Sequence, residues 1–165
     1  MMKLIMESDI LPKSLYTEIL NTYGIPNYAN VPKHTLYHNT HLEYVGNIIH
    51  SGILLSKSKQ LEYSGNMIWC TSTPNQKGYG GITIAFNATN LEYEQVNNDE
   101  FCVYENVPVS NILFIDLPVV SRDFQVYRLS DIPRLVDEYG EKSVINVCNK
   151  FPEQYIPITD VLLYI

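Results

Sequence analysis

The stretch 36–52 constrains the fold most, because it joins three different local patterns. A short apolar run, Leu36–Tyr37, ends on the polar cluster His38–His41. Apolar residues then recur at helical spacing over Leu42–Ile49, and Gly52 follows where a helix C-terminus favours glycine. We therefore expect a strand, a loop that presents polar side chains, and a helix that packs against the strand.

Further short apolar runs, separated by turn-forming residues, follow along the chain. The predicted strands are Thr35–His38, Met67–Thr71, Ile82–Phe86, Phe101–Tyr104 and Ile112–Ile115, with further candidates at Val144–Cys148 and Val161–Ile165. Helices are expected from Ser14, as an N-cap, to Gly24 and from Ser130 to Gly140. Residues 87–99 are expected to form an exposed loop. Short strands with few helices between them predict an α+β fold with antiparallel or mixed sheets.

The length of 165 residues allows one domain with a full hydrophobic core. The helix near Ser14 is followed by the turn-rich segment 27–32, so residues 1–33 are expected to form an N-terminal helical appendage. Residues 34–165 are expected to form a single domain.

The composition narrows the classes of partner and location. The formal net charge of −7 argues against strong binding to duplex nucleic acid, because phosphate contacts need clustered Lys and Arg. No apolar run approaches the ~18 residues of a membrane span, and the N-terminus lacks a signal-peptide pattern. We therefore expect no membrane partner and a cytoplasmic location. The three cysteines are widely spaced without a CxxC pair, which predicts reduced thiols and no structural zinc.

The polar cluster His38–His41 has two interpretations from its chemistry alone. His38 and His41 lack a clear third ligand, so no metal site is predicted. A histidine that hydrogen-bonds to backbone groups of a loop is the commoner case. No fixed-spacing motif for nucleotide binding or hydrolysis occurs in the chain.

Leu36–Thr40, with the helix end Ile48–Leu54 that follows, resembles the opening segment of ADP-ribosyltransferases of the histidine-tyrosine-glutamate class. That class includes the poly(ADP-ribose) polymerases and, with variations, toxins that modify DNA bases. In these families a strand ends on the histidine, which here is His38, and a helix ends soon afterwards. The resemblance covers Leu36–Leu117.

Two later segments resemble the next parts of the family's pattern. Met67–Ser72 resembles the strand that carries the family's tyrosine, and Trp69 stands at the tyrosine position. Tyr79 fits the place of a second aromatic residue. Asn98–Glu105 resembles the strand that begins with the catalytic glutamate, which here is Glu100.

The resemblance implies an ADP-ribosyltransferase-like catalytic domain with split antiparallel or mixed sheets and few flanking helices. This domain would use NAD as a substrate, need no metal, and move ADP-ribose to a macromolecular acceptor with release of nicotinamide. Glu100 would stabilise charge on the ribose, and His38 would donate a hydrogen bond to the adenosine-side ribose. The implied NAD-binding residues are His38, Asn39, Thr40, Trp69, Thr71, Ser72 and Tyr79. The implied acceptor is a protein or a nucleobase, as for a toxin or an effector.

Several of these assignments have an alternative. Trp69 could be a core residue of its apolar run, and Glu105 is the second candidate for the catalytic carboxylate. The chain could also be a catalytically silent module that binds NAD or ADP-ribose, or an interaction effector on the same fold.

Overall fold

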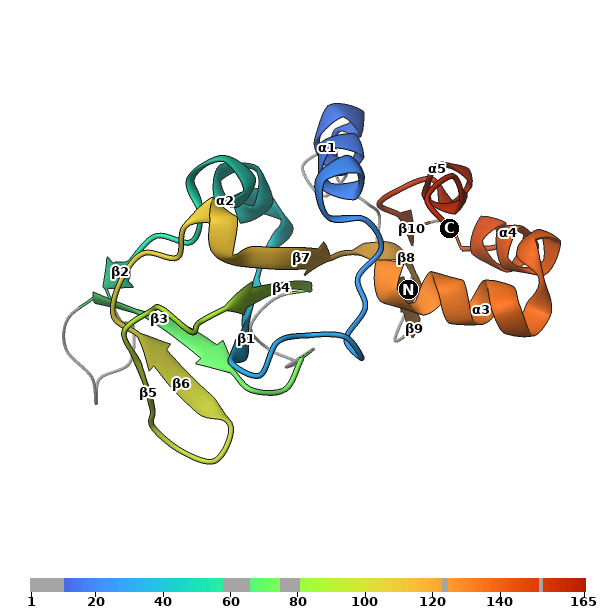
Figure 1. Cartoon of the computed structure of the whole chain (residues 1–165). Coiled ribbons are helices and arrows are strands. Elements are labelled where there is room, and N and C mark those ends of the chain that lie inside the picture. The colour runs from blue at the N-terminus through green and yellow to red at the C-terminus, as the bar shows by residue number, and fades with distance from the viewer. Residues whose placement is uncertain (1–10, 58–65, 75–80, 123–124, 152) are drawn as a thin grey trace. The chain divides into compact units, whose positions relative to one another are not determined.

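The structure is a computed structural model that describes residues 11–57, 66–74, 81–122, 125–151 and 153–165, and its architecture is α+β (Figure 1). The chain forms two compact units. Unit 1 contains the N-terminal segment up to Tyr28 together with Asp116–Ile165, and unit 2 is Ala29–Ile115. The N-terminal helix therefore shares a unit with C-terminal residues, although the sequence predicts a separate N-terminal appendage.

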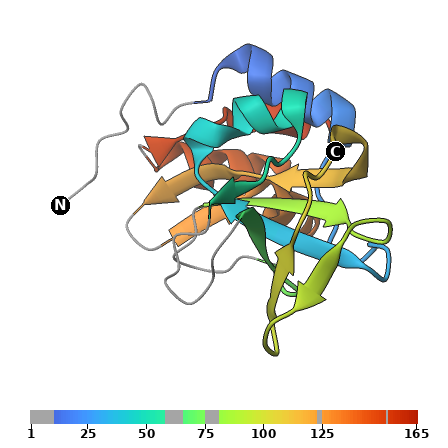
Figure 2. The same cartoon turned by 90° about the vertical axis from the view of Figure 1, so that its left-hand side faces the viewer.

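The sheet of unit 2 holds the segments that carry the resemblance. Its strands are β1 (Thr35–Thr40), β2 (Ser56–Lys57), β3 (Asn66–Thr71), β4 (Ile82–Asn87), β5 (Tyr93–Gln95), β6 (Glu100–Val103) and β7 (Ile112–Asp116). The strand order is β5-β6-β3-β1-β4-β7, with β2 paired to β3. The β5–β6 hairpin forms one edge of this sheet (Figure 2). The five strands predicted from apolar runs in this region are thus confirmed.

Strand β1 pairs very differently with its two neighbours. It pairs antiparallel with β4 along its whole length, from Thr35 opposite Asn87 to Thr40 opposite Ile82. Its register with β3 consists of a single antiparallel pair, Tyr37 opposite Thr71. β1 therefore parts from β3 beyond Tyr37, and the sheet is split at that point.

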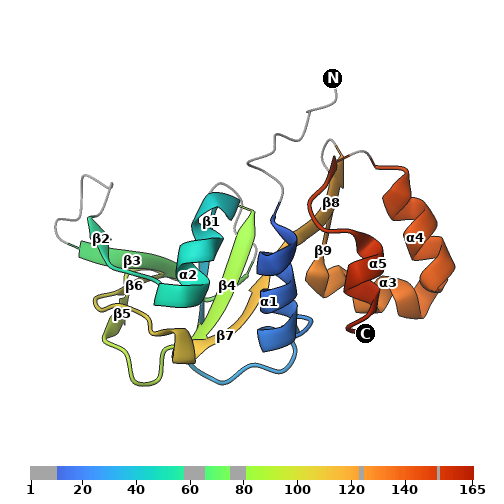
Figure 3. The same cartoon turned by 90° about the horizontal axis from the view of Figure 1, so that it is seen from above.

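Helix α2 (Val45–Ser51) follows the 3-10 turn η2 (Leu42–Tyr44) and covers one face of the sheet (Figures 1 and 3). Its buried side chains are Val45, Ile48 and Ile49, as the helical spacing predicts. The expected helix is confirmed, with a tight 3-10 start.

Gly52 ends α2 in a conformation and a space that admit glycine alone. Its φ is +77°, and a Cβ added there would lie 2.1 Å from the carbonyl oxygen of Val107. The close approach arises because Ile53 and Val107 exchange backbone hydrogen bonds of 3.0 and 2.8 Å. This bridge fixes the exit of α2 against the turn before β7.

Unit 1 combines a separate sheet with several helices. Its elements are α1 (Lys13–Tyr23), β8 (Pro118–Arg122), β9 (Gln125–Arg128), η4 (Leu129–Asp131), α3 (Ile132–Tyr139), α4 (Glu141–Asn149), β10 (Glu153–Gln154) and α5 (Ile158–Leu162). The sheet has the order β10-β8-β9 and is antiparallel. No helix in the described part of the chain is long and apolar enough to cross a membrane.

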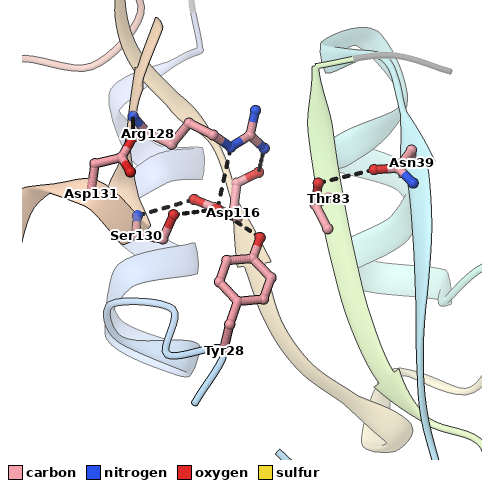
Figure 4. Close-up of polar contacts among 7 residues, drawn as sticks. All are labelled: Tyr28, Asn39, Thr83, Asp116, Arg128, Ser130 and Asp131. Atoms are coloured by element: carbon pink, nitrogen blue, oxygen red, sulfur yellow. Dashed lines mark hydrogen bonds and ion pairs between the residues drawn. The ribbon is translucent and has the colours of Figure 1, made fainter. Parts of the chain in front are cut away.

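A buried carboxylate organises the polar interior of unit 1 (Figure 4). Asp116 is 0% exposed, and its Oδ2 accepts hydrogen bonds from the Tyr28 hydroxyl at 2.7 Å and the Ser130 hydroxyl at 2.6 Å. The Arg128 guanidinium pairs with the same oxygen at 3.3 Å and donates to the Asp116 carbonyl at 3.0 Å. A buried charge needs such compensation. The network also joins the N-terminal segment of unit 1 to its C-terminal segment.

Two predicted strands are wrong, because both segments are helical. Val144–Cys148 lies in α4, where Val144 and Cys148 are buried and Val147 is exposed, which is helical spacing. Val161–Ile165 overlaps α5, which begins after Pro157 and buries Ile158 and Val161. The β-branched residues in these short runs imitate a strand pattern.

Three smaller expectations also need correction. Helix α1 has Pro12 as its N-cap instead of Ser14, because proline at that position already holds a fixed φ of −57°. The segment 87–99 contains β5, which pairs with β6 despite its few apolar residues. The strands β8, β9 and β10 were not expected. The predicted helix from Ser130 to Gly140 is confirmed as η4 followed by α3.

Gly52→Ala should lower the free energy of unfolding by about 3 kcal/mol or more, since backbone strain adds to the overlap with Val107. Urea titration followed by far-ultraviolet circular dichroism measures this. Gly24→Ala is the matched control, because Gly24 also has a positive φ, +70°, but has nothing within 4 Å of its added Cβ. The control should lose about 1 kcal/mol. Equal losses in the two variants would contradict the close approach at Gly52.

Candidate functional site

A small cavity lies where β1 parts from β3. Its volume is about 110 Å³, and it is lined by His38, Asn39, Trp69, Cys70, Thr71 and Glu100. These residues come from β1, β3 and β6, which are the three strands that carry the sequence resemblance. The structure therefore brings five of the sequence-predicted site residues together.

His38 bridges the gap between β1 and β3 with its side chain. Its Nδ1 lies 2.9 Å from the carbonyl oxygen of Trp69. A carbonyl oxygen only accepts, so Nδ1 carries the hydrogen and donates it. Burial lowers the pKa of His38, which keeps the ring neutral at pH 7. In this tautomer Nε2 is an acceptor, so the ring would accept a hydrogen bond from a ribose hydroxyl instead of donating one.

Glu100 opens β6 directly opposite Thr71 of β3. Its Oε1 accepts a hydrogen bond of 2.9 Å from the Asn97 side-chain amide. The Asn97 Oδ1 in turn accepts the backbone N–H groups of Glu100 at 3.0 Å and of Asp99 at 3.2 Å. Glu100 is thus held from its backbone and from one carboxylate oxygen.

Asp99 ties the end of β3 to the residue before Glu100. Its carboxylate accepts hydrogen bonds from the Ser72 hydroxyl at 2.5 Å, the Thr73 hydroxyl at 2.8 Å and the Thr73 N–H at 3.1 Å. The bond from Ser72 contributes most to lowering the pKa of Asp99. The Ser72 N–H also donates to the Asp99 carbonyl, which extends the pairing of β3 with β6 by one step.

Sequence reasoning missed Asn97 and Asp99 as parts of the site. The signal that could have found Asn97 is an asparagine placed shortly before a strand, where its side chain commonly accepts backbone N–H groups two and three residues on. The contacts of Asp99 depend on the pairing of β3 with β6, which the sequence does not state.

The remaining predicted residues lie in different situations. Thr71 lines the cavity, but its hydroxyl donates to the Thr73 carbonyl at 2.7 Å. Ser72 and Thr40 do not line the cavity, because Ser72 turns to Asp99 and Thr40 is buried in the ladder with β4. Tyr79 lies outside the described residues.

Asn39 is oriented by the neighbouring strand (Figure 4). Its Oδ1 accepts a 3.0 Å hydrogen bond from the Thr83 hydroxyl of β4. Because Thr83 fixes the oxygen of the amide, the Asn39 side chain reaches the cavity wall in a set orientation.

Glu105, the second candidate for the catalytic carboxylate, is placed elsewhere. Its Oε2 accepts the Glu92 backbone N–H at 2.7 Å, and it does not line the cavity. This hydrogen bond holds the residue that directly precedes β5. The positions of the two carboxylates therefore favour Glu100 over Glu105 as the candidate catalytic carboxylate.

The cavity combines groups of different chemistry in a small space. Its lining residues include Trp69, Glu100, the neutral His38 and Cys70, and burial raises the pKa of the Cys70 thiol well above its usual value. Among the described residues, no three His, Cys, Asp or Glu side chains gather as metal ligands. Its volume is below the roughly 300 Å³ at which pockets for drug-sized ligands begin, so it has room for a single small ring.

A larger cavity, of about 300 Å³, belongs to unit 1. It is lined by Tyr127, Leu135, Tyr139, Ser143, Val144, Val147 and Cys148. It contains none of the residues predicted for the site and no acid or base suited to NAD chemistry. The smaller cavity is therefore the better candidate despite its size.

Comparison with known protein families and curated proteins identifies no relative of this chain. No protein-family model matches the chain, and no curated protein matches it either. The interpretation of the cavity therefore depends on its own residues.

Acidification should destabilise the folded chain through His38. The pKa of His38 is lowered from 6.5 in the folded state, so the unfolded state binds the proton more tightly. The stabilisation by the neutral ring is fully present above pH 6.5 and is lost as the pH falls below that value. His38→Asn keeps an N–H donor near the Trp69 carbonyl but does not titrate. Its free energy of unfolding should therefore fall less than that of the wild type between about pH 7 and about pH 5.

Urea titrations at a series of pH values measure this difference. The other three histidines, His34, His41 and His50, are present in both proteins and cancel in the comparison. Parallel pH curves for wild type and His38→Asn would contradict a half-buried, neutral His38.

Proposed function

We propose that this chain is an NAD-dependent mono-ADP-ribosyltransferase with an ADP-ribosyltransferase-like fold. It would move ADP-ribose from NAD to a macromolecular acceptor and release nicotinamide. The observation that supports this most is the meeting of His38, Trp69 and Glu100 around one cavity. These residues are far apart in the sequence, and the resemblance implies all three as site residues.

The geometry suits cleavage of the bond between the ribose C1′ and the nicotinamide nitrogen. When that bond breaks, its electron pair leaves with nicotinamide, and the ribose gains oxocarbenium-like positive charge. A fixed carboxylate beside the ribose stabilises this charge in the transition state. The acceptor then forms a new bond to C1′ and loses a proton. Glu100 is the carboxylate for this role, because it lines the cavity and Asn97 holds it in place.

The remaining cavity residues suit recognition of the nicotinamide half of NAD. The Trp69 ring offers a stacking surface worth ~1 kcal/mol beyond burial. The size of the cavity fits the nicotinamide ring alone, so the phosphates and the adenosine would lie beyond its wall. The His38 Nε2 is available as an acceptor for a ribose hydroxyl.

The acceptor is either a protein or an accessible nucleobase. The net charge of −7 weighs against an acceptor that must be gripped as a duplex. A toxin or effector that acts in the cytoplasm would fit this acceptor range.

Glu100→Gln should lower the rate of nicotinamide release from NAD at least about 100-fold, because glutamine keeps the shape and loses the charge. Its affinity for NAD should change little. Release is measured by chromatography of labelled NAD incubated with the protein and a cell lysate. Glu105→Gln is the matched control, since Glu105 is a carboxylate near the same strand that does not line the cavity. It should turn over NAD like the wild type.

Isothermal titration of the wild type with NAD separates the alternatives. Binding without nicotinamide release would indicate a catalytically silent NAD-binding module. An absence of both binding and release would contradict the NAD site altogether and leave an interaction effector.

A further inference from the structure

The carboxylate of Glu100 has an asymmetric environment. Oε1 is held by the Asn97 amide at 2.9 Å. For Oε2, no hydrogen-bond partner occurs among the described residues, and Glu100 lines the cavity. One oxygen is therefore fixed and the other is available to a ligand.

Asn97 is itself immobilised by the turn that it closes. Its Oδ1 accepts two backbone N–H groups, from Asp99 and from Glu100. The Asn97 N–H and the Val96 N–H both approach the Glu100 carbonyl, at 3.4 and 2.9 Å. The Asn97 side-chain amide, which donates to Glu100, is therefore held through its own oxygen and through the Asn97 backbone.

The same turn is also attached to the end of β3. The Asp99 carboxylate binds the hydroxyls of Ser72 and Thr73, the two residues that follow Thr71. Because Thr71 lines the cavity and pairs with Glu100, this attachment holds the end of β3 beside the start of β6.

We infer that Asn97 is the positioning residue of Glu100, holding one carboxylate oxygen so that the other faces the cavity. This inference rests on the proposed function for its catalytic meaning. Asn97 does not line the cavity, so it acts through Glu100 and touches no substrate.

Asn97→Asp tests the contact with little change to the turn. The aspartate oxygen still accepts the two backbone N–H groups, but the donor to Glu100 is replaced by a second carboxylate oxygen. Repulsion between the two carboxylates disfavours the ionised form of Glu100. Asn98→Asp is the charge-matched control, since it adds the same charge one residue along without a contact to Glu100.

The titratable groups near the Glu100 carboxylate must be the same in all three proteins for this comparison to hold. They are His38 and Cys70 in the cavity, Cys102 on the same strand, Asp99 beside it and Glu94 on β5. Neither variant changes any of them.

Nicotinamide release should fall about 10- to 100-fold in Asn97→Asp at neutral pH, with the KM for NAD nearly unchanged. The acid limb of its pH–rate profile should move to higher pH by roughly one unit or more. Asn98→Asp should keep the wild-type rate and profile. A merely structural role for Asn97 would lower activity at every pH without moving the limb.

A second measurement does not depend on turnover. The side-chain carboxyl carbon of Glu100 is followed by NMR against pH in the three proteins. Its titration should move to higher pH in Asn97→Asp and stay in place in Asn98→Asp. Identical titrations in the two variants would overturn the inference. If the wild type releases no nicotinamide, the proposed function fails, and the carboxyl titration alone decides whether Asn97 holds Glu100.

Discussion

The hydrogen bond from His38 Nδ1 to the Trp69 carbonyl defines the site, because it lies where two paired strands separate. β1 keeps its full ladder with β4 but meets β3 in register only at Tyr37. Just beyond that pair, the side chain of His38 connects β1 to β3 by donating a hydrogen bond to the Trp69 carbonyl. The same bond fixes the tautomer of the ring and leaves its other nitrogen as an acceptor.

Near this split, hydrogen bonds from polar side chains hold segments that backbone strand pairing holds elsewhere in the sheet. The side chains of Asn97 and Asp99 hold the turn before β6 by accepting five hydrogen bonds from neighbouring backbone N–H and hydroxyl groups, besides the bond that Asn97 donates to Glu100. These contacts hold Glu100 on β6 beside β3, which carries Trp69, and both residues line the cavity. Preorganisation of this kind is what a reaction with a charged transition state requires.

The apolar runs predicted the strands of unit 2 well, because each run is bounded by turn-forming residues and half-buried in one sheet. The same reasoning failed in unit 1, where Val144 and Val161 lie in short helices whose burial depends on tertiary packing. His38, Trp69 and Glu100 were predicted as site residues from the resemblance, because each stands in one of the three segments that carry it. The roles of Asn97 and Asp99 could not be predicted, because their contacts exist only once β3 and β6 pair.

The most direct test of the site uses the intrinsic fluorescence of Trp69, which is the single tryptophan of the chain. NAD that stacks its nicotinamide ring on the indole should quench the emission in a saturable titration, and adenosine monophosphate, which lacks that ring, should not. Free nicotinamide should compete with NAD for the effect. Emission that stays unchanged up to millimolar NAD would contradict a nicotinamide pocket at the split between β1 and β3.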